Sequence, residues 1–379
     1  MNATDGAVGL RLTLARACAW ALLVAGWIGI GSLALQFSAS LTLGFGLVAC
    51  WLLALGAAAS VATRADTQRW ARACALVIAG AITALALWSS VRGGGLTAVW
   101  IALIGWAALT ALASGVVRSL RLAQAAMPAP PIGAAALGAL CAGLVLGDPG
   151  DLPSLAFRLA VFVAGVVVML VLLQRRIDER ARAPGCRAGL FDCSLPAWPS
   201  GAWRDPLQWP TLLAGVAMLP MMAGLPLMAD WCRAESVAPQ VMVLLHLVAM
   251  FGPALLLRQA IARWSPLTLA IVCTVLLLAG GAFVLWAASP LNLLGLAVMH
   301  GAAWGVAWGG QLWAPARRGQ QGASPWRAAL GYAALTFGFG LVVEQLGVRG
   351  VAVVHIALGL AAALAWLVRS VLTRRSHSY

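Results

Sequence analysis

The chain has 379 residues, of which 62% are hydrophobic and 9% are charged. This composition excludes an ordinary soluble protein, because apolar runs of about 20 residues are typical of membrane-spanning helices. The formal net charge is +14, and every basic residue is arginine. Arginines in the short loops of a membrane protein mostly set its orientation, so the charge does not indicate a nucleic-acid partner.

The apolar segments predict an all-α polytopic membrane protein with about twelve transmembrane helices. They do not alternate apolar and polar residues, as the strands of a membrane β-barrel would. No cleavage site follows the first segment, so we expect no removable signal peptide. The expected spans are residues 12–36, 41–63, 71–91, 96–117, 132–147, 155–174, 211–231, 237–257, 267–288, 291–313, 327–347 and 350–371.

The loops between these spans alternate in charge. Arginines gather before the first span, after each even-numbered span up to the tenth, and after the last. The other loops, such as Asp148-Pro-Gly-Asp151, are poor in arginine. The positive-inside rule therefore predicts that both termini are cytoplasmic, in agreement with an even number of spans.

The longest polar stretch lies in the middle of the chain and separates six spans from six. We expect a six-helix bundle over residues 1–174, a cytoplasmic central loop over 175–209, and a second six-helix bundle over 210–379. This spacing is typical of two transporter halves that hold a substrate near the middle of the membrane.

Two pairs of candidate metal ligands follow this loop. Met218 and Met222 lie four residues apart on the seventh span, and His246 and Met250 lie four apart on the eighth. In a helix, residues at this spacing share a face and lie about 6 Å apart. Thioether and imidazole groups without a carboxylate suit a soft metal, and Cu(I) is the first candidate. Methionine is also a common gap-filler, whereas an ionisable residue inside a membrane is a functional candidate by default.

The six-plus-six layout with a basic central loop resembles the major facilitator superfamily. The segment His246-Leu-Val-Ala-Met250-Phe-Gly-Pro, followed by Arg258 and Arg263, resembles one branch of it, the CcoA-like bacterial copper importers. Those importers supply copper for the assembly of haem–copper cytochrome oxidases, and they pair Met-x-x-x-Met on helix seven with His-x-x-x-Met on helix eight. The resemblance implies that Met218, Met222, His246 and Met250 handle copper.

The same resemblance implies a secondary transporter of the bacterial inner membrane that imports copper by rocking of two bundles. Copper is then the substrate, no cofactor is permanently bound, and copper carriers on either side of the membrane are possible partners. Cys50 and Cys232 occupy the places of family cysteines in helix two and near the end of helix seven, which implies accessory metal or thiol roles. The chain departs from the family at Leu256-Leu-Arg258, where Thr-Gly is common, and in the loop after the second helix, which lacks the superfamily's glycines.

Other polar groups inside the spans leave further hypotheses open. His300 and His355 could ligate haem together with His246, or each could bond a backbone carbonyl; we expect a structural role for His355 and an accessory polar role for His300. Glu344, the only acid well inside a span, is a candidate for proton coupling or for an ion pair with Arg349.

Other function classes are disfavoured or kept as alternatives. The chain has no glycine-rich phosphate loop and no nucleophile–base constellation, so we do not expect an enzyme. Cys186 and Cys193 lack zinc-finger spacing and are expected to be free thiols. One alternative is a transporter of an organic solute or a metal–siderophore complex, in which the methionines only pack. The other is a haem-binding or assembly subunit of a membrane complex.

Overall fold

The computed structural model describes residues 3–37, 40–64, 69–123, 131–146, 152–174, 209–231, 239–286, 291–313 and 325–376, which are helical except at a few turn and capping residues. Twelve long helices follow the twelve predicted spans in order. They are α1 (Ala3–Phe37), α2 (Leu41–Arg64), α3 (Arg69–Ser89), α4 (Gly95–Ala123), α5 (Pro131–Leu146), α6 (Leu152–Gln174), α7 (Trp209–Trp231), α8 (Pro239–Leu256), α10 (Pro266–Trp286), α11 (Leu291–Trp313), α12 (Pro325–Leu346) and α13 (Val348–Ser376). A short turn η1 (Ser90–Gly94) precedes α4, and a short helix α9 (Arg258–Arg263) follows α8.

Most of these helices are suited to a lipid bilayer. Within the described ranges, nine are long and apolar enough to cross a membrane, and parts of α5, α7 and α8 form shorter apolar helices. On α10 the large side chains of Leu267, Ile271 and Val275 are exposed one turn apart, while Cys273 and Leu277 are buried. A row of exposed apolar side chains is costly in water but favourable against lipid, which indicates that this face of α10 meets the membrane.

The helices form two compact units, each described here by itself. Unit 1 holds α1, α2 from Gly46 onward, α3 to α6, and α12 up to Ala333. Unit 2 holds Ser40–Phe45, α7 to α11, α12 from Ala334 onward, and α13. The predicted central loop, residues 175–209, lies outside the described residues except for Trp209, which begins α7, so its cytoplasmic placement stays a prediction.

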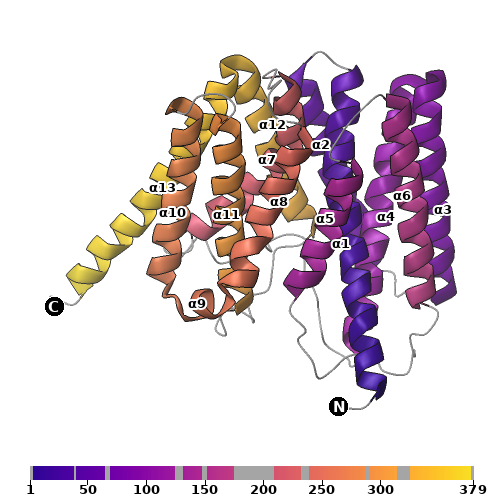
Figure 1. The fold of residues 1–379 in the computed structure, drawn as a ribbon, viewed down its shortest axis with the longest axis horizontal. Coiled ribbons are helices and arrows are strands. Elements are labelled where there is room, and N and C mark those ends of the chain that lie inside the picture. The colour runs from indigo at the N-terminus through magenta and orange to yellow at the C-terminus, as the bar shows by residue number, and fades with distance from the viewer. Residues whose placement is uncertain are drawn as a thin grey trace. The chain divides into compact units, whose positions relative to one another are not determined.

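In unit 1, α1 contacts α4, α5 and α6, and α3, at the outer edge in Figure 1, contacts both α4 and α6. A buried hydrogen bond joins α4 to α1, where Trp106 Nε1 donates to the carbonyl oxygen of Leu22 at 2.8 Å. Beside it, a Cβ added to Gly26 would lie 2.8 Å from the ring of Trp51 and 2.9 Å from Trp106 Nε1. Only a glycine at this position allows the two tryptophan rings to pack so closely against α1.

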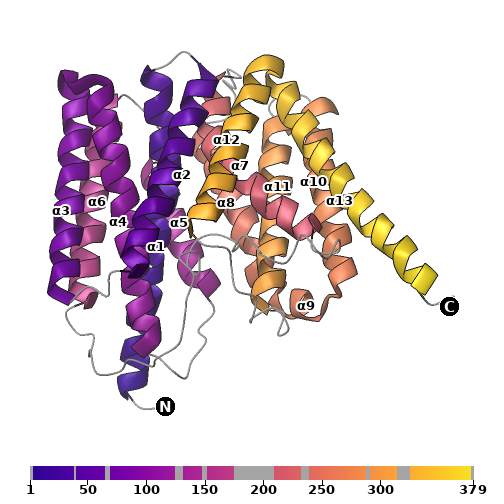
Figure 2. The same cartoon turned by 180° about the vertical axis from the view of Figure 1, so that it is seen from behind.

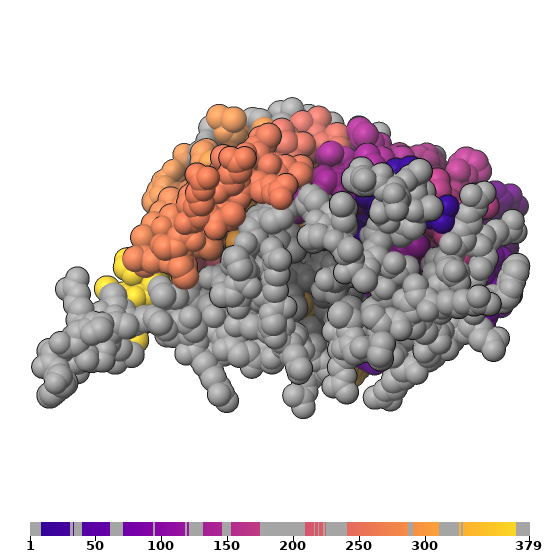
Figure 3. Space-filling view, turned by 90° about the horizontal axis from the view of Figure 1, so that it is seen from below, coloured from indigo at the N-terminus to yellow at the C-terminus, as the bar shows by residue number. Residues whose placement is uncertain are grey.

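In unit 2, α11 is central, because it contacts α7, α8, α9 and α10. Helix α13 packs against α10, as the views from both sides show (Figure 1 and Figure 2). A buried core of this unit joins α7, α9, α10 and α11 through Ala214, Ile261, Leu269, Cys273, Leu277, Ala303, Val306 and Ala307. Helix α9 forms part of the orange surface seen in Figure 3, and its residues Arg258 and Arg263 are exposed.

Helix α12 continues into α13 through a single residue, Gly347, whose φ of 59° lies in the left-handed region. This conformation is accessible to glycine without strain, which explains why a glycine separates two long helices here. The hydrogen bond from Gly350 N to Gly347 O at 2.9 Å closes the turn. The turn fixes the start of α13, the helix that carries His355.

Candidate functional site

Helix α8 buries a single face, and that face carries the predicted histidine and methionine. The exposed apolar residues of α8 include Val241, Leu245 and Val248, which lie on the other side. Both His246 and Met250 are 0% exposed, one turn apart. The buried positions recur every three or four residues, as an amphipathic helix requires: Met242, Val243, His246, Leu247, Met250, Phe251 and Ala254.

The predicted methionine pair of the seventh span is buried on α7. Met218 is 1% exposed and Met222 is 3% exposed, and the neighbouring Met221 is 0% exposed. Helix α7 contacts α8 as well as α10, α11 and α13. The two pairs therefore occupy contacting helices of one unit, and all four side chains are buried there. Their role as copper ligands remains a hypothesis, considered below.

Two glycines of α11 bring that helix close to the histidine-bearing helix α8. A Cβ added to Gly301 would lie 2.7 Å from the carbonyl oxygen of His246 and 3.1 Å from the Cβ of Ala249. A Cβ added to Gly305 would clash with the carbonyl oxygen of Met250. Small residues of this kind allow two membrane helices to approach until their backbones touch. This contact sets the position of His246 relative to α11.

Three buried histidines from α8, α11 and α13 lie together in unit 2. His246 Nδ1 lies 2.7 Å from the carbonyl oxygen of Ala297. His355 Nδ1 lies 2.9 Å from the carbonyl oxygen of Val351, and His355 Nε2 lies 2.8 Å from His300 Nδ1. The rings of His246 and His300 are nearly parallel with their centres 5.9 Å apart, whereas the rings of His300 and His355 meet edge to face at 4.9 Å.

These hydrogen bonds determine which nitrogen of each neutral ring carries the proton. A carbonyl oxygen only accepts, so Nδ1 donates in both His246 and His355. His355 Nε2 is then an acceptor, and His300 Nδ1 must donate to it. By this assignment Nε2 is the unprotonated nitrogen in His246 and in His300. Both of these Nε2 atoms are buried and have no hydrogen-bond partner among the residues that the structure describes.

An aromatic cluster packs beside the histidines. Trp304 and Trp308 of α11 are stacked with ring centres 4.8 Å apart, and Phe251 of α8 meets both edge to face at 5.9 and 6.0 Å. The three side chains are 6% exposed or less.

Glu344 caps the start of α2, where residues Ser40–Phe45 belong to the same unit. Ser40 Oγ donates to both carboxylate oxygens at 2.9 Å, and Thr42 N donates to Oε2 at 2.6 Å. The carboxylate thereby accepts an N–H from the first turn of α2, where the helix dipole favours negative charge. Glu344 therefore has a structural role at this helix end; its use in proton coupling remains a hypothesis.

Of the two cysteines singled out by family resemblance, only one lies among the described residues. Cys50 lies on α2 in unit 1 as a half-buried free thiol. Cys232 lies outside the described residues, as do Cys186 and Cys193. In the part of the chain that the structure describes, no three side chains of histidine, cysteine, aspartate or glutamate could together hold a metal ion. A metal site built from the described residues alone would include thioether sulfur or have fewer than three of those ligands.

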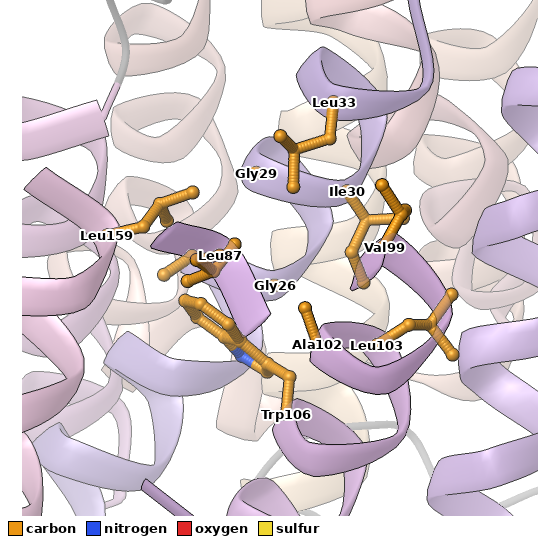
Figure 4. Close-up of a pocket in the computed structure, with 11 residues that line it drawn as sticks. Gly26, Gly29, Ile30, Leu33, Leu87, Val99, Ala102, Leu103, Trp106 and Leu159 are labelled. Carbon is orange, nitrogen blue, oxygen red and sulfur yellow. The ribbon is translucent and has the colours of Figure 1, made fainter. Parts of the chain in front are cut away.

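Unit 1 contains a small cavity between α1, α3, α4 and α6, shown in Figure 4. Its lining is entirely apolar in character, with Ile30, Leu33, Val99 and Leu103 on one side and Trp106 on another (Figure 4). The space open to water-sized spheres is about 10 Å³, which is room for one water at most. The cavity is therefore a packing defect between helices and not a substrate site in this conformation.

The helices, their order and the buried polar groups define a polytopic all-α membrane protein with the fold of major facilitator transporters, as the sequence predicted. The sequence matches no protein-family model, and no curated protein matches it. Solved structures do match the fold over nearly the whole chain.

The crystal structure of the nucleoside transporter NupG has a TM-score of 0.61 at 18% identity, and the match covers 98% of this chain and 99% of that chain. The xylose transporter XylE from E. coli, in a partially occluded inward-open conformation, has a TM-score of 0.63 at 14% identity over 94% of this chain and 97% of that one. A bacterial homologue of the human lysosomal transporter Spinster has a TM-score of 0.56 at 14% identity over 96% of each chain. At these identities the likeness concerns the fold.

The histidine cluster is the feature that the sequence did not reveal. The three residues are 54 and 55 positions apart along the chain, on three different helices. The sequence feature that could have pointed to this cluster is that all three histidines lie inside apolar spans. The direct contact between His300 and His355 leaves no gap for a porphyrin between these two rings, which argues against the haem hypothesis for this pair.

Proposed function

We propose that the protein is a secondary transporter of the bacterial inner membrane that imports copper, with Met218, Met222, His246 and Met250 as its copper-handling residues. The observation that carries the proposal is the state of His246. It is fully buried, its Nδ1 bonds to the carbonyl oxygen of Ala297, and its Nε2 has no hydrogen-bond partner in the described part of the chain. Histidines that bind metals usually have this arrangement, with one nitrogen fixed by a hydrogen bond and the other free to coordinate.

The chemistry of the neighbouring groups supports a soft cation as the substrate. Met250 lies one helical turn from His246 on the same buried face, and α7 brings two further buried methionines. Thioether and imidazole ligands favour Cu(I), whereas magnesium and calcium require oxygen ligands. Because these side chains are neutral in this state, a bound monovalent ion would add only a single positive charge to the membrane interior.

Transport is supported by the fold. In such proteins two bundles alternately expose a site near the middle of the membrane. An ion that must also be released cannot be held too tightly, so we expect two or three ligands at a time instead of a closed cage of four. In this mechanism the thioethers of α7 and α8 exchange the ion with His246, and rocking of the bundles determines the side to which it is released. We take the net direction to be inward, as the resemblance to copper importers implies.

The experiment is uptake of radiolabelled copper by cells that express the wild type or a variant at equal levels. We expect Met222→Ala and His246→Ala to lose most of the uptake. Met221→Ala is the matched control, because Met221 is an equally buried methionine next to Met222 on the same helix. Unchanged uptake in both site variants would contradict the proposal. Uptake of an organic solute without any response to copper would favour the alternative carrier.

A further inference from the structure

We propose that His300 is a second imidazole ligand for the same ion and that His355 is the residue that positions it. The inference rests on the proposed function, since it assigns a further ligand to the site around His246. It depends on how the three histidines bond to one another, which neither the spacing of the methionines nor the resemblance to copper importers addresses.

Two ring nitrogens of the histidine cluster keep a lone pair that could bind an ion. His355 uses both ring nitrogens, one toward Val351 and the other toward His300. His246 and His300 each use Nδ1 as a donor and keep Nε2 unprotonated, with no hydrogen bond to any described residue. The cluster of three histidines therefore offers two nitrogen ligands. This count agrees with the finding that the described histidines, cysteines and acids provide no three-ligand metal site.

Leaving those two nitrogens without hydrogen bonds costs free energy of folding. A buried acceptor with no hydrogen bond is destabilising, and most buried polar groups in proteins avoid this state. The two atoms belong to rings that are nearly parallel with their centres 5.9 Å apart, and a cation that reaches both would satisfy them. Both rings are 0% exposed and both belong to the closely packed helices α8 and α11. Along α8, two buried methionines, Met242 and Met250, each lie four residues from His246 and could supply a thioether.

His355 holds His300 in the form that can bind an ion. Its hydrogen bond to His300 Nδ1 fixes the tautomer that leaves His300 Nε2 free, and the bond to Val351 fixes His355 in turn. A metal-binding histidine usually has such a partner on its other nitrogen, and loss of that partner typically lowers metal affinity about 10- to 100-fold. His355 does not itself coordinate, so it acts on the ion only through His300.

The test uses the purified full-length protein in detergent, loaded with Cu(I) without oxygen. X-ray absorption counts the imidazole ligands, and competition with a Cu(I) chelator gives the affinity. We expect two imidazoles in the wild type and one in His300→Leu, with a lower affinity. His355→Leu should weaken binding about 10- to 100-fold, and His355→Gln, which keeps an acceptor for His300 Nδ1, should recover part of it. Thr274→Val is the control, because Thr274 is a buried polar residue on a neighbouring helix of unit 2.

The outcomes separate this inference from the proposed function. If the wild type binds Cu(I) through one imidazole, or if His300→Leu keeps wild-type affinity while His246→Ala loses it, His300 is not a ligand and the copper transporter stands. If the wild type binds no Cu(I), both proposals fall. If His300→Leu does not fold, the imidazole count of the wild type and of the ring-preserving His300→Phe still decides.

Discussion

The close approach of α8 and α11 gives the sharpest prediction, because the change Gly301→Ala acts on the histidine site without altering the side chain of a proposed ligand. The added Cβ would lie 2.7 Å from the carbonyl oxygen of His246. That oxygen belongs to the helix backbone, so it cannot turn aside as a flexible side chain could. To reach an ordinary contact of 3.4 Å, the two helices must separate locally by roughly 0.7 Å.

This separation acts on the hydrogen bond between the same two helices. The distance from His246 Nδ1 to the oxygen of Ala297 is now 2.7 Å, and a shift of that size would move it beyond the usual range of about 2.7–3.2 Å. Overpacking typically costs about 1–3 kcal/mol, and loss of the hydrogen bond adds about 1 kcal/mol. We therefore expect Gly301→Ala to lower the free energy of unfolding by roughly 2–4 kcal/mol.

The assay is thermal unfolding of the purified protein in detergent, followed by Cu(I) titration of the folded fraction. Gly252→Ala is the matched control, because Gly252 lies on α8 and a Cβ added there has no neighbour within 4 Å. That change should be neutral or stabilising, since alanine has the higher helix propensity. If Gly301→Ala is as stable as Gly252→Ala and binds Cu(I) equally well, the close packing of α8 on α11 does not position His246.

Three further changes test other parts of the structure. Trp106→Phe removes the buried hydrogen bond to Leu22 and should lower the free energy of unfolding by about 1 kcal/mol. Trp27→Phe should lower it less, because Trp27 Nε1 has no hydrogen-bond partner among the described residues. Equal losses in thermal unfolding would refute this. Glu344→Ala and Ser40→Ala should each lower the unfolding temperature, and the double variant should lose less than both losses together because the two residues share one hydrogen-bonded cap; strict additivity would show that they are independent. Val275→Arg on the exposed face of α10 should reduce insertion into membranes by about 2.5–3.5 kcal/mol, while Val275→Leu should not; normal insertion of the arginine variant would place this face away from lipid.

Much of the fold could be predicted from the sequence, because the property that selects a membrane helix is local. A run of apolar residues long enough to cross the bilayer is visible without knowing its neighbours. The tenth predicted span, 291–313, coincides with α11, and the second, 41–63, differs from α2 by one residue. The first helix extends further than predicted, beginning at Ala3, because hydropathy does not detect a polar helical extension beyond the apolar run.

The site could be predicted only in part. The spacing of His246 and Met250 predicted one shared face, and α8 does bury both on one side. The partner of His246 could not be found in the same way, since Ala297 contributes a backbone oxygen that any residue type could provide. The bond between His300 and His355 depends on how α11 and α13 pack, and no local pattern encodes that register.

The most direct test of the account is Cu(I) transport by the purified protein in sealed lipid vesicles, with the wild type compared with His246→Ala and with Met221→Ala. The account predicts copper accumulation in vesicles with the wild type and with Met221→Ala, and little above empty vesicles with His246→Ala. Equal accumulation with all three proteins, or none with the wild type, would contradict the claim that a soft cation crosses the membrane by way of the buried histidine on α8.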